Sequence, residues 1–413
     1  MKNAAPKAIA VQHVIDDVMR RNRGRLLAGL ISRLRDFQLA EDALQEASIS
    51  ALKHWSRTGT PHDPLAWLLK VGLNKGIDHI RAGQRETRKS EAVGRVSPDH
   101  MTEDLPDTIP DERLRLIFTC CHPALEEKSR VALTLRIVCN LTTREIAAAF
   151  LDTDQTMGQR LARAKSKIKS KGIGFSVPEP DQWSERLGTV LSTLYLIFTT
   201  GYVTEDASPR DLCLEGIFLA RLLNQLRPNE PEIQGALALM LLTEARKPAR
   251  VNADGATVPV EDQDKALWNR SFISQAHDLL ATAMNSRDPG PFQIKAAIAD
   301  CHMQNPGPDW QQMSLLYQSL WGFEPTPIVA LNWAVVIAQT GRAELALQKL
   351  DDLQPDLQAF QPWHAARAHV LEELRQYHDA CDAYEQAIEK APSDAARMLL
   401  RHKLRAARQK SRG

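Results

Sequence analysis

Apolar residues recur at steps of three and four along almost the whole chain, and the strict apolar–polar alternation that predicts strands is scarce. The stretch 84–110 is polar and contains Pro98, Pro106 and Pro110, which is the composition of a linker. The pattern therefore predicts an all-α protein with two small helical domains, a linker between them and a longer helical region after them. The three helical blocks cover residues 10–83, 111–174 and 181–413.

The last block contains a repeat with an offset of 34 residues, and Pro392 closes its second unit. Small residues stand where two helices of a pair would cross, which is the tetratricopeptide pattern. The clearest units cover 328–393, and because solenoids need about three units we expect the preceding helices to continue the stack. In 249–260, Asp254-Gly255 between short β-prone runs predicts a small two-stranded hairpin. The corresponding repeat positions are Ala334, Gly341, Ala346 and Leu350 in one unit and Ala368, Arg375, Ala380 and Tyr384 in the next.

Residues 139–172 predict two short helices with a tight turn between them. Thr142 and Glu145 form the pattern of a capping box at the start of the first helix, and Thr153 or Asp154 can cap the second. One face of the second helix is apolar, with Met157, Leu161, Ala164 and Ile168. The other faces are polar and basic, with Gln155, Thr156, Gln159, Arg160, Arg163, Lys165, Lys167 and Lys169.

This pair fits a helix-turn-helix, in which Gln and Arg side chains near the start of the second helix reach base edges and later lysines meet phosphates. A structural helix pair with a solvated basic face is the alternative interpretation, because helix pairs are common. Either interpretation leaves the buried stripe of the second helix unchanged.

Residues 63–89 predict a helix with two distinct faces. An aromatic, an amide and a run of basic groups on one helix suit unstacked single-stranded nucleic acid, although Trp67 also fits a core position. The preceding helix, 36–55, carries acids and suits either a protein partner or simple packing. The predicted apolar face has Ala66, Leu69, Leu73, Ile77 and Ile80. The other face has Trp67, Val71, Asn74, Asp78 and Arg81.

Charge divides the chain into a basic and an acidic part. Residues 1–180 contain 29 Lys and Arg against 22 Asp and Glu, whereas residues 181–413 contain 23 against 29. A polyanion partner is expected for the first part. No apolar run approaches the roughly 20 residues that cross a bilayer, and the start of the chain lacks the apolar region of a signal peptide. We therefore expect a soluble cytoplasmic protein that makes no membrane contact.

The six cysteines do not form a disulfide pattern. Cys120, Cys121 and His122 are adjacent and Cys139 follows, which is not the spacing of metal ligands. We expect reduced, packed thiols, no metal and no cofactor. The sequence also contains no nucleophile–base pair or phosphate loop, so we expect no enzyme.

Placed in order, these features resemble a bacterial alternative sigma factor of the extracytoplasmic-function group, within the sigma-70 family. The resemblance is carried by "LAEDALQEA", "PLAWLLKVGLNKGIDHIR" and "LTTREIAAAFLDTDQTMGQRLARAKSKI". It implies sigma region 2 at 10–83, a linker at 84–110 and sigma region 4 at 111–174. The C-terminal part, 181–413, is similar to the tetratricopeptide-like extension of one subgroup, on stretches such as "DLCLEGIFLARLL" and "ALALMLLTEAR".

The resemblance also implies partners and site residues. Core RNA polymerase would bind through its β′ clamp helices and its β flap, and promoter DNA would bind through both sigma regions. The residues implied for the β′ clamp helices are Leu39, Asp42, Gln45 and Glu46. Those implied for melting the minus-10 element and holding a flipped base are Asn74, Lys75, Asp78 and Arg81. Those implied for the minus-35 element are Gln155, Thr156, Gln159, Arg160, Arg163 and Lys167.

Two other classes of protein remain open from the residues alone. A repressor or activator whose repeats sense a ligand would need no polymerase-binding helix, and an enzyme with a helical accessory domain would need a reactive site. The extension itself could inhibit the sigma regions, be required for their activity, or recruit a protein or peptide. We expect it to act as an intramolecular regulator.

Overall fold

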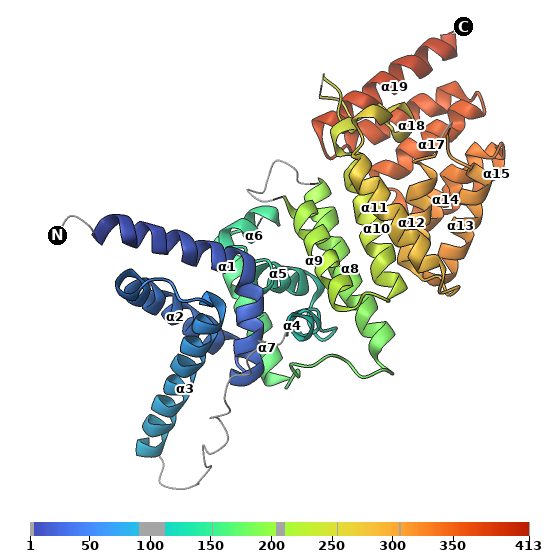
Figure 1. Cartoon of the computed structure of the whole chain (residues 1–413). Coiled ribbons are helices and arrows are strands. Elements are labelled where there is room, and N and C mark those ends of the chain that lie inside the picture. The colour runs from blue at the N-terminus through green and yellow to red at the C-terminus, as the bar shows by residue number, and fades with distance from the viewer. Residues whose placement is uncertain are drawn as a thin grey trace. The chain divides into compact units, whose positions relative to one another are not determined.

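The structure is a computed structural model that describes the backbone of residues 4–90, 112–150, 152–203, 211–253, 255–304 and 307–412. Side chains are described from Val11 onward within these ranges, except for Arg20, Arg21, 83–90 and Val203. The described residues form helices and no sheet, as predicted (Figure 1). The chain divides into two compact units, Met1–Leu219 and Ala220–Gly413.

Unit 1 begins with three long helices, α1 (Ala4–Leu34), α2 (Phe37–Thr58) and α3 (Pro64–Ser90), which pack on one another. Asp36 caps α2, because its carboxylate accepts hydrogen bonds from the backbone N–H groups of Gln38 at 3.0 Å and Leu39 at 3.1 Å. The α2 face toward the other two helices consists of small and apolar residues. Its buried members are Phe37, Ala40, Ala43, Leu44, Ala47, Ala51 and Trp55.

The buried face of α3 differs from the predicted one. Leu68 and Leu69 are buried, and Gly72 and Gly76 pack directly on Leu30 and Leu34 of α1. Of the predicted face only Leu69 is fully buried, and Ala66, Leu73, Ile77 and Ile80 are half-buried. The prediction was wrong because an apolarity count gives glycine no weight, whereas glycine lets two helix backbones approach closely.

Helix α3 continues to Ser90, past residue 84, where we placed the start of the linker. The rest of the predicted linker, 91–110, lies outside the described residues.

The next four helices form the second part of unit 1: α4 (Arg113–Cys120), α5 (Glu127–Ile137), α6 (Thr143–Ala149) and α7 (Asp154–Ser170). The capping box at Thr142 and Glu145 is confirmed, with both reciprocal hydrogen bonds present. Thr153 caps α7 by accepting a hydrogen bond from the N–H of Thr156 at 3.1 Å. The predicted stripe of α7 is also confirmed, because Met157, Leu161, Ala164 and Ile168 are all buried.

Unit 1 extends further along the chain than predicted. We placed the start of the extension at 181, but α8 (Trp183–Val203) and the first part of α9 (Leu212–Leu226) belong to unit 1. The ring of Trp183 lies 5.2 Å from that of Phe118 on α4, and Arg186 donates a hydrogen bond to the Phe118 carbonyl at 3.0 Å. Apolar residues of α8 are buried along its length, so this helix completes the core that α4 and α5 begin.

Unit 2 is organised around α10 (Pro231–Ala245), which is buried almost all round. Helices α11 (Arg270–Met284) and α12 (Pro291–Cys301) pack on it, and α13 (Trp310–Phe323) follows. Gly235 permits this packing, since a Cβ there would lie 2.6 Å from the backbone nitrogen of Gln293. The short 3₁₀ helices between α10 and α11 are Lys247–Ala249, Val260–Asp262 and Lys265–Leu267.

The predicted 34-residue repeat is confirmed as two stacked helix pairs. The remaining helices are α14 (Pro327–Gln339), α15 (Ala343–Asp352), α16 (Gln354–Leu357), α17 (Gln361–Glu373), α18 (Tyr377–Glu389) and α19 (Asp394–Arg412). Ala334 and its counterpart Ala368 are fully buried. Gly341 and its counterpart Arg375 both adopt left-handed backbone, with φ of 82° and 59°. The equivalence thus extends to the turn that joins each pair.

The predicted hairpin is shorter than expected. Within the described residues, the segment has one antiparallel bridge, between Val251 and Thr257, and no strand. The Asn252 side chain accepts a hydrogen bond from the N–H of Ala256 at 2.9 Å, and Gly255 has a φ of 79°. The chain therefore turns back at this segment, held by Asn252, and the pairing does not extend beyond one bridge. Asp254 lies outside the described residues.

Candidate nucleic-acid and partner interface

Helix α7 presents three different faces. Its apolar stripe is buried against α5 and α6. A second stripe, at steps of four residues, is exposed and contains Gln155, Gln159, Arg163 and Lys167, with Thr156 beside it. A third face carries the small residues Gly158 and Ala162 and then Lys165 and Lys169. The second face combines amide, guanidinium and ammonium donors on one exposed helix surface, and such donors bind base edges and phosphates.

Arg160 differs from the other predicted residues of α7. Its guanidinium Nη1 lies 2.7 Å from Asp152 Oδ2, and its side chain is 20 % exposed. The pair joins α7 to the residue just before its cap, so Arg160 fixes the turn of the helix-turn-helix. The predicted DNA-reading set is therefore divided, with Arg163 free at the surface and Arg160 held in an ion pair.

The candidate surface on α3 consists of Asn74, Asp78 and Arg81, which are exposed and share one side of the helix. Lys75 lies beside them, and its Nζ is 3.8 Å from Glu46 Oε2 on α2. His79 also contacts Glu46, with Nε2 2.6 Å from Oε1. These two contacts with Glu46 hold α3 on α2, next to the exposed stripe.

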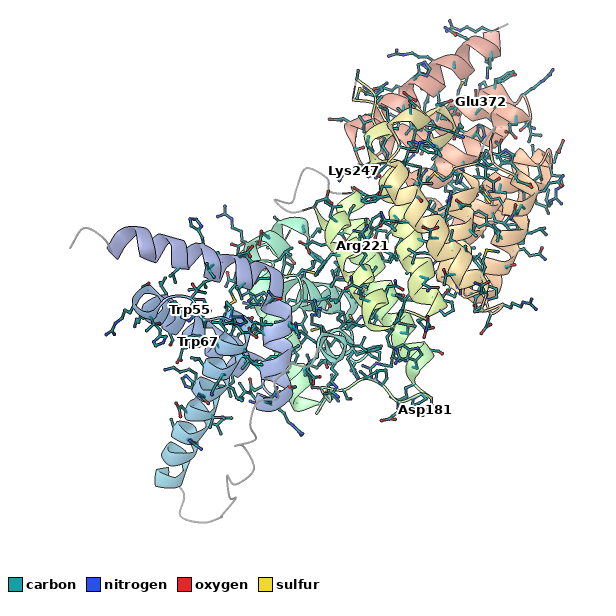
Figure 2. All side chains as sticks on the ribbon, in the orientation of Figure 1. Trp55, Trp67, Asp181, Arg221, Lys247 and Glu372 are labelled. Atoms are coloured by element: carbon teal, nitrogen blue, oxygen red, sulfur yellow. The ribbon has the colours of Figure 1, made fainter. Side chains whose placement is uncertain are left out.

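Trp67, at the start of the same stripe, is a packing residue on most of its surface. Its ring packs edge-on against Trp55 with centroids 5.2 Å apart (Figure 2) and stacks on His54 at 5.8 Å. Trp55 is buried, whereas Trp67 is half-buried. Part of the Trp67 side chain therefore remains accessible, on the same side of α3 as Asn74 by helical spacing.

The predicted polymerase-binding residues lie on the outer side of α2. Asp42 and Gln45 are exposed, whereas Leu39 and Glu46 are half-buried. Asp42 Oδ1 accepts a hydrogen bond from Gln38 Nε2 at 3.0 Å. Asp42 and Gln45 also border a groove of about 560 Å³, and its opposite wall includes Thr143, Gly158 and Leu161.

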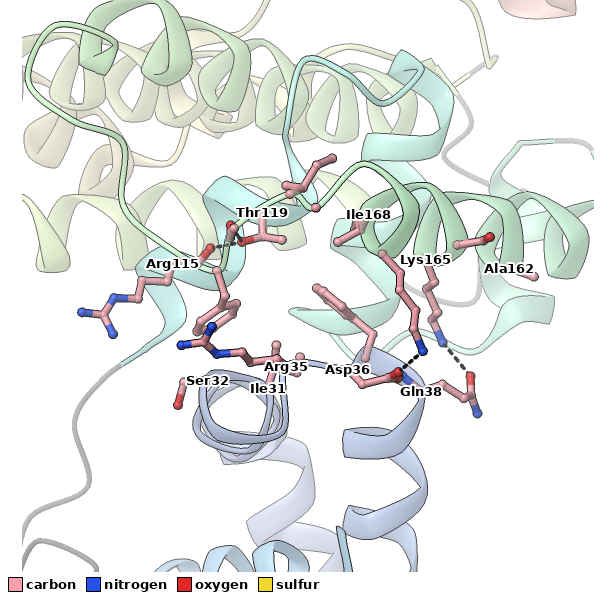
Figure 3. A pocket seen from close by; sticks show the side chains of 17 residues that line it. Ile31, Ser32, Arg35, Asp36, Gln38, Arg115, Thr119, Ala162, Lys165 and Ile168 are labelled. Carbon is pink, nitrogen blue, oxygen red and sulfur yellow. Dashed lines mark hydrogen bonds and ion pairs between the residues drawn. The ribbon is translucent and has the colours of Figure 1, made fainter. Parts of the chain in front are cut away.

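Glu41, next to Asp42, is the most enclosed acid of this surface, with a side chain that is 10 % exposed. Its carboxylate lies 3.3 Å from Arg23 Nη2 of α1 and 3.7 Å from Arg136 Nε, just inside the C-terminal end of α5. Lys165 of α7 donates a hydrogen bond to the same carboxylate. A second pair joins Lys169 Nζ to Asp36 Oδ2 at 2.7 Å (Figure 3). We call these six residues, Asp36, Glu41, Arg23, Arg136, Lys165 and Lys169, the Glu41 cluster.

The electrostatics of the cluster favour its charged form. Burial by itself would raise the pKa of Glu41, but the hydrogen bond from Lys165 and the charges of Lys165, Arg23 and Arg136 hold it below its usual range. Burial would likewise raise the pKa of Asp36, and Lys169 together with two backbone N–H groups lowers it. Both carboxylates are therefore ionised at neutral pH and bind the cations of α5 and α7 by charge.

The cysteine-rich segment packs as predicted. Cys120 and Cys121 are buried, and burial raises the pKa of both thiols, so they stay protonated. His122 Nδ1 accepts a hydrogen bond from the N–H of Ala124 at 3.1 Å, which assigns it to a turn. In the described part of the chain, the one group of side chains close enough to hold a metal ion lies elsewhere, at exposed His378, Asp379 and Asp382. No helix among the described residues has the length and apolarity to cross a bilayer.

Comparisons with known proteins match three segments of the chain. Residues 18–86 match the family model of sigma-70 region 2, residues 115–168 match sigma-70 region 4, and residues 186–284 match a family of unknown function, DUF6596. The first two matches fall on α1–α3 and α4–α7. The third begins within α8 and ends with α11, so it crosses from unit 1 into unit 2.

The chain is also similar to several known proteins over different shares of its length. An uncharacterised protein of Rhizobium meliloti is 41 % identical over 92 % of this chain and 93 % of its own length. The ECF RNA polymerase sigma factor SigK of Mycobacterium ulcerans is 30 % identical over 35 % of this chain and 72 % of its own length. The ECF RNA polymerase sigma factor SigG of Mycobacterium tuberculosis is 23 % identical over 55 % of this chain and 65 % of its own length.

A helix-turn-helix and an α1–α3 bundle, both with exposed polar stripes, define a nucleic-acid-binding protein of the sigma class. The chain belongs to the ECF RNA polymerase sigma factor family. Its general function is therefore transcription initiation, and a DUF6596 segment follows its sigma regions.

The sequence did not reveal the Glu41 cluster. Lys165 and Lys169 were grouped with the basic residues of α7, and Glu41 was one acid among several on α2. One signal was present, because Gly158, Ala162, Lys165 and Lys169 form a helical stripe of two small residues followed by two lysines. Small residues followed by cations suit close contact with an acidic helix. The identity of that helix, more than 120 residues away in sequence, was not contained in the pattern.

Proposed function

We propose that the protein binds core RNA polymerase, recognises two promoter elements and separates the DNA strands at one of them. The chain does no bond chemistry in this proposal. Its work is to position the polymerase and to hold an unpaired strand. The observation that carries the proposal is the pair of exposed polar stripes on α3 and α7, each set on the helix that its sigma region model covers.

The outer side of α2 is proposed to bind the β′ clamp helices. Asp42 and Gln45 are exposed there, and Leu39 supplies a half-buried apolar contact beside them. An apolar centre with polar groups around it is the usual composition of a protein interface. Glu46 is proposed to act mainly by holding α3, since it contacts both Lys75 and His79.

The stripe of Asn74, Asp78 and Arg81 is proposed to hold the separated minus-10 strand. Extracting a base from a duplex costs a few kcal/mol of stacking and pairing, which contacts to the flipped base must offset. The amide of Asn74 and the carboxylate of Asp78 can read base edges, Arg81 can bind the backbone, and the accessible edge of Trp67 offers a surface for stacking.

The exposed face of α7 is proposed to enter the major groove at the minus-35 element. Gln155, Gln159 and Arg163 reach base edges, and Lys167 meets a phosphate. Arg160 acts through its ion pair with Asp152, which holds the turn and so aims the helix.

The extension is proposed to modulate the activity of the sigma regions. Its first helix, α8, contributes Trp183 and Arg186 to the core around Phe118 of α4, so the stability of region 4 depends on residues of the extension. The helix pairs α14–α15 and α17–α18 are proposed to bind a protein or peptide partner.

Reconstitution tests the central proposal. Transcription start sites mapped after overexpression give the promoter, and the purified protein is then combined with core polymerase and that DNA. The double variant Asp42→Ala/Gln45→Ala should lose core binding and keep its fold. A matched control removes one exposed carboxylate and one exposed amide elsewhere, as Asp181→Ala/Gln182→Ala, and should bind as the wild type does. Failure of the wild type to bind core polymerase would refute the proposal.

A further inference from the structure

We infer that α19 carries a further nucleic-acid-binding surface, which binds the phosphate backbone of duplex DNA without reading its sequence. The surface is a stripe of four exposed arginines, which we call the α19 stripe. Its members are Arg401, Arg405, Arg408 and Arg412. The inference goes beyond the proposed function, and it rests on that function only for the choice of duplex DNA among polyanions.

Charge is distributed unevenly within unit 2. Residues 220–393 contain 14 Lys and Arg against 22 Asp and Glu, whereas the 19 residues of α19 contain seven Lys and Arg against one Asp. Five of the seven cations are arginines. A cationic helix on an otherwise acidic unit draws a polyanion to that helix and repels it from the rest of the unit. The acidic balance of 181–413 as a whole therefore conceals one basic surface.

The spacing of the α19 stripe suits a row of phosphates. Its arginines recur at steps of four, three and four residues, so they lie along one side of the helix. From Arg401 to Arg412 the helix rises roughly 16 Å at 1.5 Å per residue. Over that length one strand of B-form DNA presents about five phosphates, at roughly 3.4 Å each. Because a guanidinium can bind a phosphate through two parallel hydrogen bonds, a straight row of arginines fits the backbone of a stiff duplex.

Most of the stripe's charge is not neutralised inside the protein. Arg408 contacts Glu385 of α18, whereas Arg401, Arg405 and Arg412 have no carboxylate within ion-pair distance among the described residues. The helix dipole favours cations in the last turn, which accounts for Arg412. It does not account for Arg401 and Arg405, which precede that turn. Three guanidinium groups are therefore available for an external anion.

The apolar side of α19 is already occupied, and this limits the kinds of partner that its basic side can bind. Leu400, Leu404 and Ala407 are buried in one cluster with Ala383 and Tyr384 of α18 (Figure 1). A basic amphipathic helix that binds a membrane surface inserts its apolar side, and one that binds a protein groove inserts apolar anchors. Neither mode is open to α19 while it packs on α18. Its partner is therefore recognised by charge, which a phosphate backbone provides.

Duplex DNA is the polyanion on which transcription initiation takes place. A contact from α19 adds to the contacts of the sigma regions because all of them belong to one chain, so that the second binding event is intramolecular. The contact raises the affinity for DNA of any sequence. Its contribution falls steeply with salt, since each phosphate contact releases a counterion.

The test neutralises the three arginines that lack a partner, as Arg401→Gln/Arg405→Gln/Arg412→Gln. These side chains are exposed, and the buried side of α19 is unchanged. The variant is made in the full chain, and circular dichroism and melting establish that it is folded. Anisotropy titrations then measure its binding to a labelled duplex of non-promoter sequence at several salt concentrations.

The matched control removes the same charge from exposed arginines elsewhere in unit 2. It is the full-length variant Arg270→Gln/Arg287→Gln/Arg342→Gln. A second, independent measurement places a photoreactive amino acid at exposed His402, beside the stripe, and at exposed Glu344 as its control.

We expect the α19 variant to bind the duplex at least about tenfold more weakly than the wild type at about 0.1 M salt. Its plot of log K against log salt should be less steep by about 2–3, since three phosphate contacts are lost. The control variant should match the wild type in both measurements. The photoreactive group at His402 should crosslink to the duplex, and the one at Glu344 should not.

The other outcomes are distinct. Equal salt slopes for the α19 variant and the wild type would show that the stripe is only a solvated surface and would refute the inference. An equal loss in the control variant would also refute it, since total charge and not the stripe would be responsible. If the α19 variant lost affinity for single-stranded RNA of the same length and none for the duplex, the partner would be RNA and the inference would be wrong. A wild type that does not bind core polymerase would refute the proposed function, but these measurements would still decide the role of α19 because the duplex carries no promoter.

Discussion

The ring of Phe118 on α4 lies 5.2 Å from the ring of Trp183, the first residue of α8. Phe118 is fully buried, and its backbone carbonyl accepts a hydrogen bond from Arg186 at 3.0 Å. The segment after the helix-turn-helix is therefore part of the region 4 core. A boundary drawn from composition, at 181, cuts through this core.

Truncation should reveal this dependence. A chain ending at residue 180 loses the whole of α8 and should have an unstable region 4, whereas one ending at 227 keeps α8 and α9 and should retain it. In the full chain, Trp183→Ala should lower the free energy of unfolding of unit 1 by about 2–3 kcal/mol, below the range for a fully buried Trp because Trp183 is half-buried. Trp321→Ala in unit 2, where the side chain is 38 % exposed, is the control and should leave unit 1 unchanged. Equal melting of the two truncated chains would contradict the assignment.

Lys167 and Lys169 lie two residues apart on α7 and should behave differently toward DNA. Lys167 is on the exposed stripe, so Lys167→Ala should weaken binding to all minus-35 sequences and reduce the salt slope by about 1. Lys169 contacts Asp36, so Lys169→Ala should change the DNA affinity little. Arg163→Ala should relax base preference at one position, at about 1–3 kcal/mol. Titrations of duplex DNA at several salt concentrations measure the affinity of all three variants. Identical salt slopes for the two lysine variants would contradict the assignment of the exposed α7 stripe as the DNA-binding face.

Acid should weaken the contact between the regions. The pKa of Glu41 in the folded protein lies below its unfolded value, so its contribution to stability is complete above the unfolded pKa, near 4.3, and is lost as the pH falls through the lower folded value. The cations that face it are Arg23, Arg136 and Lys165. Glu41→Gln should cost about 3 kcal/mol at pH 7. That difference should shrink toward pH 3 in denaturant titrations, and a constant difference across the range would contradict the ion cluster.

Two glycines of unit 2 should respond in opposite ways to the same substitution. Gly341 has a φ of 82°, so Gly341→Ala should destabilise unit 2 by about 1–2 kcal/mol. Gly322 lies within α13 with open space around a new Cβ, so Gly322→Ala should stabilise it by about 0.5–1 kcal/mol. Thermal unfolding of the two variants compares them directly. If both substitutions changed the stability of unit 2 in the same direction, the left-handed turn would not be the reason for a glycine at position 341.

Features that depend on neighbours along the chain were predictable. The capping box at Thr142 and the buried stripe from Met157 to Ile168 follow from helical spacing alone. The 34-residue repeat was also readable, and it even placed Arg375 at the position of Gly341, although the left-handed backbone there was not anticipated. The buried face of α3 was misplaced because Gly72 and Gly76 contribute by being small, which a count of apolar residues does not register.

By itself, the sequence determined that this chain is helical, that a basic part precedes an acidic one, and that two of its helices carry exposed polar stripes, because each of these depends on residue type and local period. Only the tertiary structure decided which residues those helices meet. Lys165 and Lys167 are chemically alike and two positions apart, yet one contacts a carboxylate 124 residues away and the other faces solvent. A two-residue step turns the side chain by about 200° around the helix axis, and the packing of α1 and α2 against that helix decides which direction is enclosed.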